Sequence, residues 1–512
     1  MKLKPALVFG ARMVLQRDEP IPVWGRSVRG DTVTVTLGAH SASALAENGA
    51  WRVELPPMEA TARTVMTVSS AVTGETLSFE DVAIGEVWLA GGQSNMEFLL
   101  KYDECAEDMY AEADDPLLRY FRYPQANFPG CLEKDAYPDD GFWRSWSGRE
   151  NKGMFSGPAA YMGRKLREAL GVPVGFIGCN WGGTPASAWT AMEDLEANPA
   201  LAPVLRWHEK MTENLDLARY YAASERPTPE PSPEEKQGME NFMMGIGLEE
   251  FFQKMAEMPP PPPVDYGPYM PGPRAAIRPA GLYENMLCKI APYALRGAIW
   301  YQGEDDDARG WGSFYGESMK TLIKSWRKLW GKALPFLQVE LAPFQGVGFT
   351  AAKDYPQIRA GQREAMDALA GVHNVCIMDV GDRINIHVRK KKPVGERLAL
   401  LARKFVYGET ALLAESPRFL RAVREGDTVK LQFQNAGEGL CLRADPAEVL
   451  DVTADGKPVA VSARAEGDCL CLTAAALQAA EKIRVSFAQR NYCVDPLFGS
   501  SGLPAFPFTV EL

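Results

Sequence analysis

A serine follows a short apolar run and two glycines in the string GEVWLAGGQSNMEF, residues 85–98. A buried strand that breaks on glycine leaves the next side chain, Ser94, at the carboxyl end of that strand. A serine hydroxyl there can act as a nucleophile, and backbone N–H groups beside it can stabilise an oxyanion. The structural alternative is a helix cap, with Glu97 completing a capping box, and spacing alone favours that interpretation. The G-x-S-x-G turn of many hydrolases does not occur around Ser94.

A serine nucleophile needs a general base, and the chain has only four histidines: His40, His208, His373 and His387. We expect His40 in an amino-terminal β region, His208 in a helix and His373 at the amino end of the strand NVCIMDV. His387 follows that strand, so it alone is predicted at the carboxyl edge of the sheet. Its structural alternative is a loop histidine near a helix start. The four residues lack metal-ligand spacing, so we expect neither a metal site nor a cofactor.

Two further loops have a suitable composition. CNWGGTPASAW places Gly182 and Gly183 after an apolar run, and IWYQGEDD places Gln302 and Glu304 after another. Glycine lets a backbone N–H approach a developing oxyanion, and a glutamine amide can donate to it. A carboxylate can bind a sugar hydroxyl. Taken singly, each fragment also suits an ordinary turn.

The elements between these loops must place them on one edge. Short apolar runs that end in glycine or acidic residues alternate with amphipathic stretches such as GPAAYMGRKLREAL and YGESMKTLIKSWRKLW. This pattern predicts an α/β core with a parallel sheet over residues 85–408. Ligands bind such sheets outside the carboxyl ends of the strands. We therefore expect Ser94 and His387 to meet there.

Other segments differ from this core. Residues 1–84 and 409–512 alternate with period two, which predicts β-rich accessory domains. Residues 205–278 contain the proline-rich SERPTPEPSPEEKQ and Pro259–Pro263 around an amphipathic stretch. This composition predicts a helical insertion with proline-rich joints, and a flexible linker is the alternative.

Composition excludes several classes of function. A net charge of −11 disfavours a nucleic-acid partner. No run approaches the roughly 18 apolar residues that span a bilayer, so no membrane partner is expected. Nine scattered cysteines and no recognisable signal peptide favour reduced thiols and a cytoplasmic protein.

Taken together, the longer strings resemble the sialate O-acetylesterase family of the SGNH-hydrolase superfamily. The resemblance rests on strings spread along most of the chain: MVLQRDEPIPVWG, GEVWLAGGQSNM, NWGGTPASAW, APYALRGAIWYQGE, YGESMKTLIKSWRKLWGKALPFLQVELAPF, VGERLAL and GLPAFPF. It implies a three-layer α/β/α SGNH-hydrolase core with a parallel sheet, plus β-rich amino- and carboxyl-terminal accessory regions. It also implies a carbohydrate O-acetylesterase that acts on an acetylated sugar, with sialate as the namesake substrate.

The resemblance assigns roles residue by residue. Ser94 would be the nucleophile and His387 the base. The oxyanion would be bound by the N–H of Ser94, a glycine N–H from the Gly182–Gly183 pair and the side chain of Gln302. Glu304 would orient His387 or the sugar.

One position departs from the family pattern. Family members usually read Asp-Ile-His-Pro, whereas this chain reads Asn385-Ile386-His387-Val388. A neutral amide stabilises an imidazolium less than a carboxylate does. Asn385 or a backbone carbonyl could position His387, Asp382 could substitute, or the enzyme could be slow. A carbohydrate-binding protein with a degenerate esterase site is therefore one alternative function. The other alternative keeps the chemistry but changes the sugar: an acetylesterase for xylan- or mannan-derived oligosaccharides.

Two groups near the predicted site remain open. The cluster Arg389–Lys392 is typical of a solvated helix start, or it attracts an acidic sugar such as sialate. Four aromatic residues flank the predicted loops, and they either stack on a sugar ring or belong to the core: Trp181, Trp189, Trp300 and Tyr301.

Overall fold

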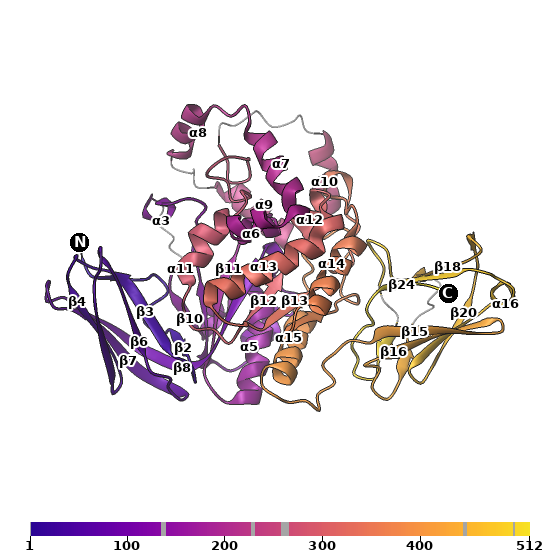
Figure 1. The fold of residues 1–512 in the computed structure, drawn as a ribbon, viewed down its shortest axis with the longest axis horizontal. Coiled ribbons are helices and arrows are strands. Elements are labelled where there is room, and N and C mark those ends of the chain that lie inside the picture. The colour runs from indigo at the N-terminus through magenta and orange to yellow at the C-terminus, as the bar shows by residue number, and fades with distance from the viewer. Residues whose placement is uncertain (1, 135–139, 227–230, 258–265, 444–447, 495–496) are drawn as a thin grey trace. The chain divides into compact units, whose positions relative to one another are not determined.

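The computed structural model describes residues 2–134, 140–226, 231–257, 266–443, 448–494 and 497–512 (Figure 1). These residues form a mixed α/β fold with a parallel sheet segment flanked by helices and antiparallel sheets toward both termini. The chain divides into two compact units. The first comprises Met1–Met244, Pro260–Gln302 and Glu317–Phe336, and the second comprises Gly245–Pro259, Gly303–Gly316 and Leu337–Leu512.

The parallel strands of the first unit carry the loops that matter for function. Their order is β10-β9-β11-β8-β12, and β9, β11, β8 and β12 are mutually parallel neighbours, while β10 is antiparallel to β9. The bounds are β8 (Thr76–Gly92), β9 (Asp115–Arg122), β10 (Trp143–Trp146), β11 (Val174–Asn180) and β12 (Gly297–Tyr301). Every residue of β11 and β12 is buried. The apolar runs in the sequence predicted this, because such runs are typical of strands covered on both faces.

Helices cover both faces of this segment. α5 (Gly157–Leu170) packs Gly163 against Phe176 of β11, and Phe176 is in register with Trp88 of β8. Gly91 lies three residues after Trp88, so it faces the opposite side, where a Cβ on it would meet Trp326 of α13 (Tyr315–Trp330) at 2.7 Å. Both helices coincide with the amphipathic stretches that predicted them.

Strand β8 joins the amino-terminal region to the core. Its first half pairs antiparallel with β7 (Thr61–Ser70), and its second half pairs in parallel with β11 and β12. The boundary proposed at residue 84 therefore falls inside a continuous strand. The other amino-terminal strands are β1 (Lys4–Pro5), β2 (Val14–Gln16), β3 (Ile21–Arg26), β4 (Thr32–Leu37), β5 (His40–Leu45) and β6 (Ala50–Leu55).

The segment predicted as an insertion is helical. It contains α7 (Ala202–Thr212), α8 (Leu217–Ser224), α9 (Pro233–Met243) and α10 (Leu248–Glu257). A capping box formed by Ser232 and Glu235 starts α9, and Pro233 occupies the first helical position, where proline is favoured. The prolines Pro259–Pro263 lie outside the described residues. The two compact units divide the segment, since α9 belongs to the first unit and α10 to the second.

β13 (Phe336–Val339), which belongs to the second unit from Leu337 on, pairs with β14 (Val372–Val375). Helices α12 (Glu304–Ala308), α14 (Tyr355–Ala368) and α15 (Lys392–Phe405) complete the residues before 409. The prediction of a strand through NVCIMDV was wrong at both ends, because His373 lies inside β14 and the strand stops at Val375. The next apolar residues, Cys376 and Met378, pack into the carboxyl-terminal core instead.

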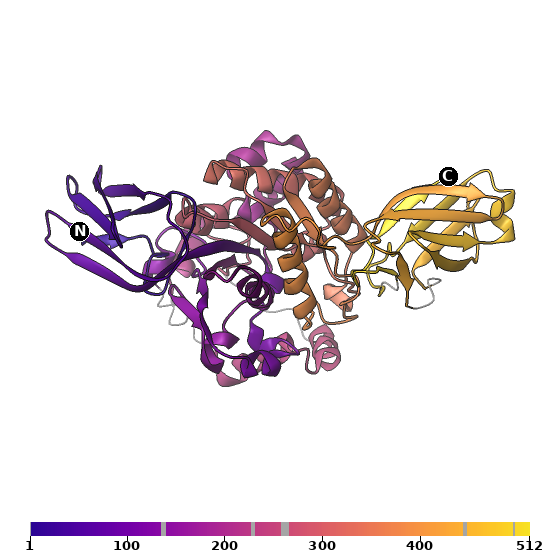
Figure 2. The ribbon, with the colours of Figure 1, turned by 90° about the horizontal axis from the view of Figure 1, so that it is seen from below.

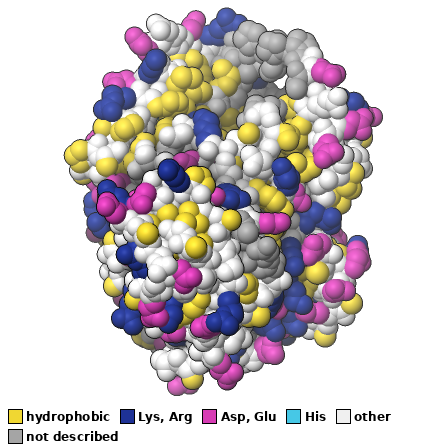
Figure 3. Space-filling view, turned by 90° about the vertical axis from the view of Figure 1, so that its right-hand side faces the viewer, with side chains coloured by type: hydrophobic (Ala, Val, Ile, Leu, Met, Phe, Trp, Pro, Cys, Tyr) yellow, Lys and Arg dark blue, Asp and Glu magenta, His cyan; other side chains and the backbone are white. Residues whose placement is uncertain are grey.

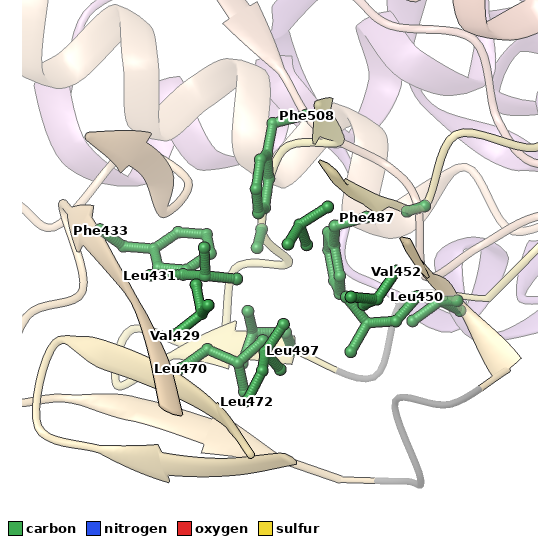
Figure 4. Close-up of a cluster of buried hydrophobic side chains, with 14 of the residues drawn as sticks. Val429, Leu431, Phe433, Leu450, Val452, Leu470, Leu472, Phe487, Leu497 and Phe508 are labelled. Atoms are coloured by element: carbon green, nitrogen blue, oxygen red, sulfur yellow. The ribbon is translucent and has the colours of Figure 1, made fainter. Parts of the chain in front are cut away.

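The carboxyl-terminal strands, drawn in yellow and orange in Figure 2, form two four-stranded sheets, β15-β16-β21-β20 and β19-β18-β22-β24, and a separate β17-β23 pair. Buried side chains from both sheets, among them Leu431, Leu472, Val452 and Phe487, form one apolar cluster (Figure 4). The strands are β15 (Arg418–Glu425), β16 (Thr428–Gln434), β17 (Leu440–Leu442), β18 (Leu450–Ala454), β19 (Lys457–Pro458), β20 (Ser462–Glu466), β21 (Cys469–Thr473), β22 (Ile483–Phe487), β23 (Leu497–Gly499) and β24 (Phe508–Glu511). The β texture predicted from about residue 410 is confirmed.

The surface mixes charges of both signs. On the face that Figure 3 draws, the described acidic and basic side chains are interspersed. No helix in the described ranges is long and apolar enough to cross a bilayer. Within those same ranges, no group of three or more His, Cys, Asp or Glu side chains is arranged to hold a metal ion.

Candidate active site

Ser94 is the first residue of the short helix α1 (Ser94–Glu97), two residues after the end of β8. The residue at the cap position is Gln93, and it makes no side-chain capping bond. The capping-box interpretation of Ser94 and Glu97 was therefore wrong. Glu97 instead accepts hydrogen bonds from Gly182 N–H at 2.8 Å and Arg122 Nη2 at 2.9 Å. The half-buried Ser94 side chain therefore does not cap the helix.

The two glycines before Ser94 serve close packing at the carboxyl edge of the sheet. Gly92 has φ +138°, and a Cβ on it would lie 2.2 Å from the Tyr301 carbonyl oxygen. The Gly92 carbonyl accepts from Trp181 N–H at 3.1 Å, and Gln93 N–H donates to the Tyr301 carbonyl at 3.1 Å. Backbone hydrogen bonds thus join the carboxyl ends of strands β8, β11 and β12. The loops that follow these three strands therefore lie together.

The loop after β11 lies against the serine. A Cβ on Gly182 would lie 3.1 Å from Ser94 Cβ, so the two residues are in contact. The Gly182 N–H is already donated to Glu97. Gly183 has φ +66°, which glycine adopts without strain, and its N–H donates to no atom of the described chain. Of the predicted glycine pair, Gly183 is therefore the member with an available donor.

Gln302 follows β12 and is fully buried. Its Nε2 donates to the Thr184 carbonyl at 3.1 Å, and the Thr184 hydroxyl donates to the Trp181 carbonyl at 2.7 Å. Gln302 therefore stabilises the loop of residues 181–184, called the glycine loop below. This loop, Ser94 and Gln302 all belong to the first unit.

An ion pair supports the same loop. Burial acts to lower the pKa of the Arg122 guanidinium, but the carboxylates of Glu97 and Asp140 outweigh it and raise that pKa. Arg122 therefore stays charged beside Glu97, to which Gln125 also donates at 3.0 Å. Glu97 accepts hydrogen bonds from both Arg122 and the Gly182 N–H, so the Arg122–Glu97 pair fixes one side of the loop.

In the second unit, His387 lies in the loop between β14 and α15 and is 6% exposed. Asn385 Oδ1 accepts from the backbone N–H of His387 at 2.9 Å. Asp382 Oδ1 in turn accepts from Ile384 N–H at 2.9 Å and Asn385 N–H at 2.8 Å. Asp382 and Asn385 therefore form successive side-chain turns that shape the backbone carrying His387.

The environment of His387 keeps its imidazole neutral. Burial, followed by the positive charge of Lys391, lowers its pKa to about 3. A neutral imidazole is the form that a general base requires at neutral pH. Lys391 is itself completely buried at the start of α15, so the interpretation of Arg389–Lys392 as a wholly solvated cluster was wrong at that position.

The other predicted residues take varied places. Glu304 is the first residue of α12 in the second unit and is 6% exposed. Trp189, Trp300 and Tyr301 are fully buried, so they belong to the core rather than to a sugar-stacking surface. The sequence did not predict a role for Tyr269, a half-exposed residue that contacts the glycine loop. The string PYMPGPR around it carries no recognisable motif.

Comparisons with known proteins find similarity to carbohydrate esterases. Residues 269–404 match the family described as carbohydrate esterase, sialic acid-specific acetylesterase. The rat (Rattus norvegicus) sialate O-acetylesterase is 27% identical over 439 residues, covering 79% of this chain and 74% of the relative. The human (Homo sapiens) sialate O-acetylesterase is 25% identical over 443 residues, covering 79% and 71%.

A solved structure extends the similarity to nearly the whole chain. The crystal structure of XAC1771, a carbohydrate acetylesterase from Xanthomonas citri, has a TM-score of 0.75 and 26% sequence identity, and covers 99% of both chains. The chain is therefore similar to carbohydrate esterases of the sialic acid-specific acetylesterase family, whose description matches residues 269–404.

Proposed function

We propose that the protein is a serine-dependent carbohydrate O-acetylesterase with an SGNH-type site. Ser94 Oγ attacks the carbonyl carbon of an O-acetyl group while His387 accepts the hydroxyl proton. The tetrahedral intermediate collapses, its C–O bond to the sugar breaks, and His387 returns the proton to the sugar oxygen. A water molecule activated by His387 then releases acetate from Ser94.

The negative charge of the intermediate needs donors that are already in place. We assign this role to the N–H groups of Ser94 and Gly183 and to the side-chain amide of Gln302. Gly182 is assigned a supporting role instead, because its N–H is donated to Glu97. Glu304 remains a candidate to orient His387 or to bind a sugar hydroxyl.

The observation that carries this proposal is the packing of Gly182 against Ser94. A Cβ at Gly182 would lie 3.1 Å from Ser94 Cβ, so the loop that would supply an oxyanion donor adjoins the hydroxyl that would attack. An accidental serine after a strand would not require a glycine loop held against it. The neutral state of His387 leaves its imidazole able to accept a proton at neutral pH, and a pKa of about 3 makes it a weaker base than one that titrates near that pH.

The substrate proposal is narrower. Sialate is the substrate that the names of the mammalian relatives suggest, whereas XAC1771 is named only as a carbohydrate acetylesterase. We therefore place 9-O-acetyl sialic acid first and acetylated xylo- and manno-oligosaccharides second. The exposed Lys390 and Lys392 would attract an acidic sugar. Charge reversal of both should raise KM for acetylated sialate and leave KM for neutral sugars unchanged.

One assay tests the proposal. Purified protein and its Ser94→Ala variant are given p-nitrophenyl acetate, 9-O-acetyl sialic acid and the acetylated oligosaccharides. We expect hydrolysis by the wild type and a loss of at least a thousandfold in kcat for the variant, since a missing nucleophile removes most of the acceleration. Sugar binding without hydrolysis by the wild type would contradict the esterase proposal and favour the degenerate binding protein.

A further inference from the structure

Tyr269 contacts the glycine loop through its hydroxyl and its ring. Its hydroxyl accepts from Trp181 Nε1 at 3.2 Å and donates to the Gly182 carbonyl at 3.2 Å. Its ring lies over the next residue, where a Cβ on Gly183 would meet Tyr269 Cε1 at 3.3 Å. All of these residues belong to the first unit, and Tyr269 lies within the segment predicted as an insertion.

The hydrogen bond to Gly182 determines the direction of a donor. The Gly182 carbonyl and the Gly183 N–H belong to one planar peptide unit, which is trans. In a trans peptide the C=O and N–H point in opposite directions, so holding the oxygen also fixes where the N–H points. Tyr269 therefore orients the Gly183 N–H without touching it.

Two consecutive glycines would otherwise leave this peptide free to rotate. Glycine has the widest range of backbone conformations, and Gly183 uses a positive φ of +66°. The loop is held at one end by Glu97, which binds the Gly182 N–H, and at the other by Gln302, which binds the Thr184 carbonyl. Neither bond restrains the peptide between Gly182 and Gly183, whereas the Tyr269 hydroxyl does.

We infer that Tyr269 is a positioning residue for the oxyanion donor: its hydroxyl holds the Gly182–Gly183 peptide so that the Gly183 N–H faces the developing oxyanion. The inference rests on the proposed esterase function. A preorganised donor lowers the barrier because it need not reorient as charge develops. Loss of the hydroxyl should therefore reduce kcat rather than substrate binding.

The test compares Tyr269→Phe with Tyr266→Phe. Tyr266 lies three residues earlier, and its hydroxyl accepts from Asn127 Nδ2 at 3.1 Å and donates to the Arg274 carbonyl at 3.4 Å, so its variant loses equivalent bonds away from the glycine loop. Two readouts are taken from each protein: backbone hydrogen exchange across residues 181–186, and kcat and KM for p-nitrophenyl acetate and for the best sugar acetate.

For Tyr269→Phe we expect faster exchange in this loop and a fall in kcat of roughly tenfold on both esters, with KM nearly unchanged. Tyr266→Phe should match the wild type in both readouts. Unchanged exchange in Tyr269→Phe would overturn the inference whether or not the protein hydrolyses esters. Faster exchange with unchanged kcat would also overturn it, because the hydroxyl would then restrain a peptide that takes no part in catalysis.

The esterase proposal fails by a different result. If the wild type and Ser94→Ala hydrolyse every ester equally slowly, the proposed function is wrong. The exchange experiment still decides whether the Tyr269 hydroxyl holds the loop. The two failures are therefore separate observations on the same set of proteins.

Discussion

Gly245 lies directly against the side chain of Asn385. A Cβ built on Gly245 would come within 2.7 Å of Asn385 Nδ2, and both residues belong to the second unit. Gly245 is in the turn between α9 and α10, within the segment predicted as an insertion. Asn385 Oδ1 accepts the N–H of His387, so the turn restrains the residue that shapes the histidine loop. The helical segment therefore supports the predicted base.

Gly245→Ala should disturb this support. The new methyl group would displace Asn385 and with it the backbone of His387, so we expect kcat/KM to fall about tenfold or more, because small misplacements of a catalytic group are costly. Gly247→Ala is the matched control, because Gly247 has a similar φ of +66° against +72° for Gly245 but nothing lies within 4 Å of its Cβ position. Both variants carry the same backbone strain, and equal activities in the two would contradict the role of the Asn385 contact.

Asn385→Asp restores the carboxylate that the family usually carries at this position. The aspartate keeps an oxygen that can accept the His387 N–H, so the turn should persist, and its charge should favour the imidazolium that forms during catalysis. We expect a severalfold higher kcat and an acidic limb of the pH–kcat/KM profile displaced to higher pH. A sharp fall in kcat with an unchanged melting temperature would instead give the amide a function of its own.

Lys391→Met should raise the pKa of His387. Burial and then the Lys391 charge lower that pKa to about 3, and the substitution removes the second cause. Because only neutral imidazole accepts the serine proton, activity is lost as pH falls through this pKa, so the acidic limb of kcat/KM should move to higher pH. Lys390→Met is the control, since Lys390 is exposed and Lys391 is completely buried. The same displacement in both variants would show that surface charge, rather than Lys391, sets the pKa.

The same pKa has a consequence for stability. Unfolded His387 has an ordinary pKa near 6.5 and folded His387 one of about 3, so between these values the unfolded chain binds more protons. The free energy of unfolding should therefore decrease as pH falls from 6.5 toward 3. His387→Gln should show a weaker decrease over pH 7 to 5 in urea unfolding. Parallel curves for wild type and variant would contradict the low pKa.

The sequence predicted the parts of the site that depend on strand ends. Ser94 and Gly182 were placed together because parallel strands end at one edge, and they are in contact. The roles of Glu97 and Tyr269 could not be predicted, because they depend on which distant backbone group each side chain meets. Glu97 had a plausible local partner in a capping box, yet the Gly182 N–H, distant in sequence, took its place.

The fold shows the same division. Helices with clear amphipathic periodicity, α5 and α13, were predicted to the residue, since one face of each meets the sheet. The strand NVCIMDV was predicted too long, because apolar composition does not reveal which core a residue joins. Cys376 and Met378 are as apolar as strand residues, but they pack into the carboxyl-terminal cluster that lies after residue 409 in sequence.

Glu97→Gln tests whether the ion pair holds the glycine loop. Glutamine has nearly the same shape but removes the charge beside Arg122, whose remaining carboxylate, Asp140, is 3.5 Å away. Hydrogen bonds to charged groups contribute about 1.5–3 kcal/mol, so we expect a loss of that order in the free energy of unfolding, together with a lower kcat as the Gly182 N–H loses its anionic acceptor. Glu107→Gln is the control, because its bond to Arg149 joins two largely exposed side chains, and such pairs contribute little. Urea unfolding and kcat are measured for both. If the Glu97 variant loses stability while kcat is unchanged, the ion pair supports the fold alone, and the glycine loop keeps its catalytic geometry without it.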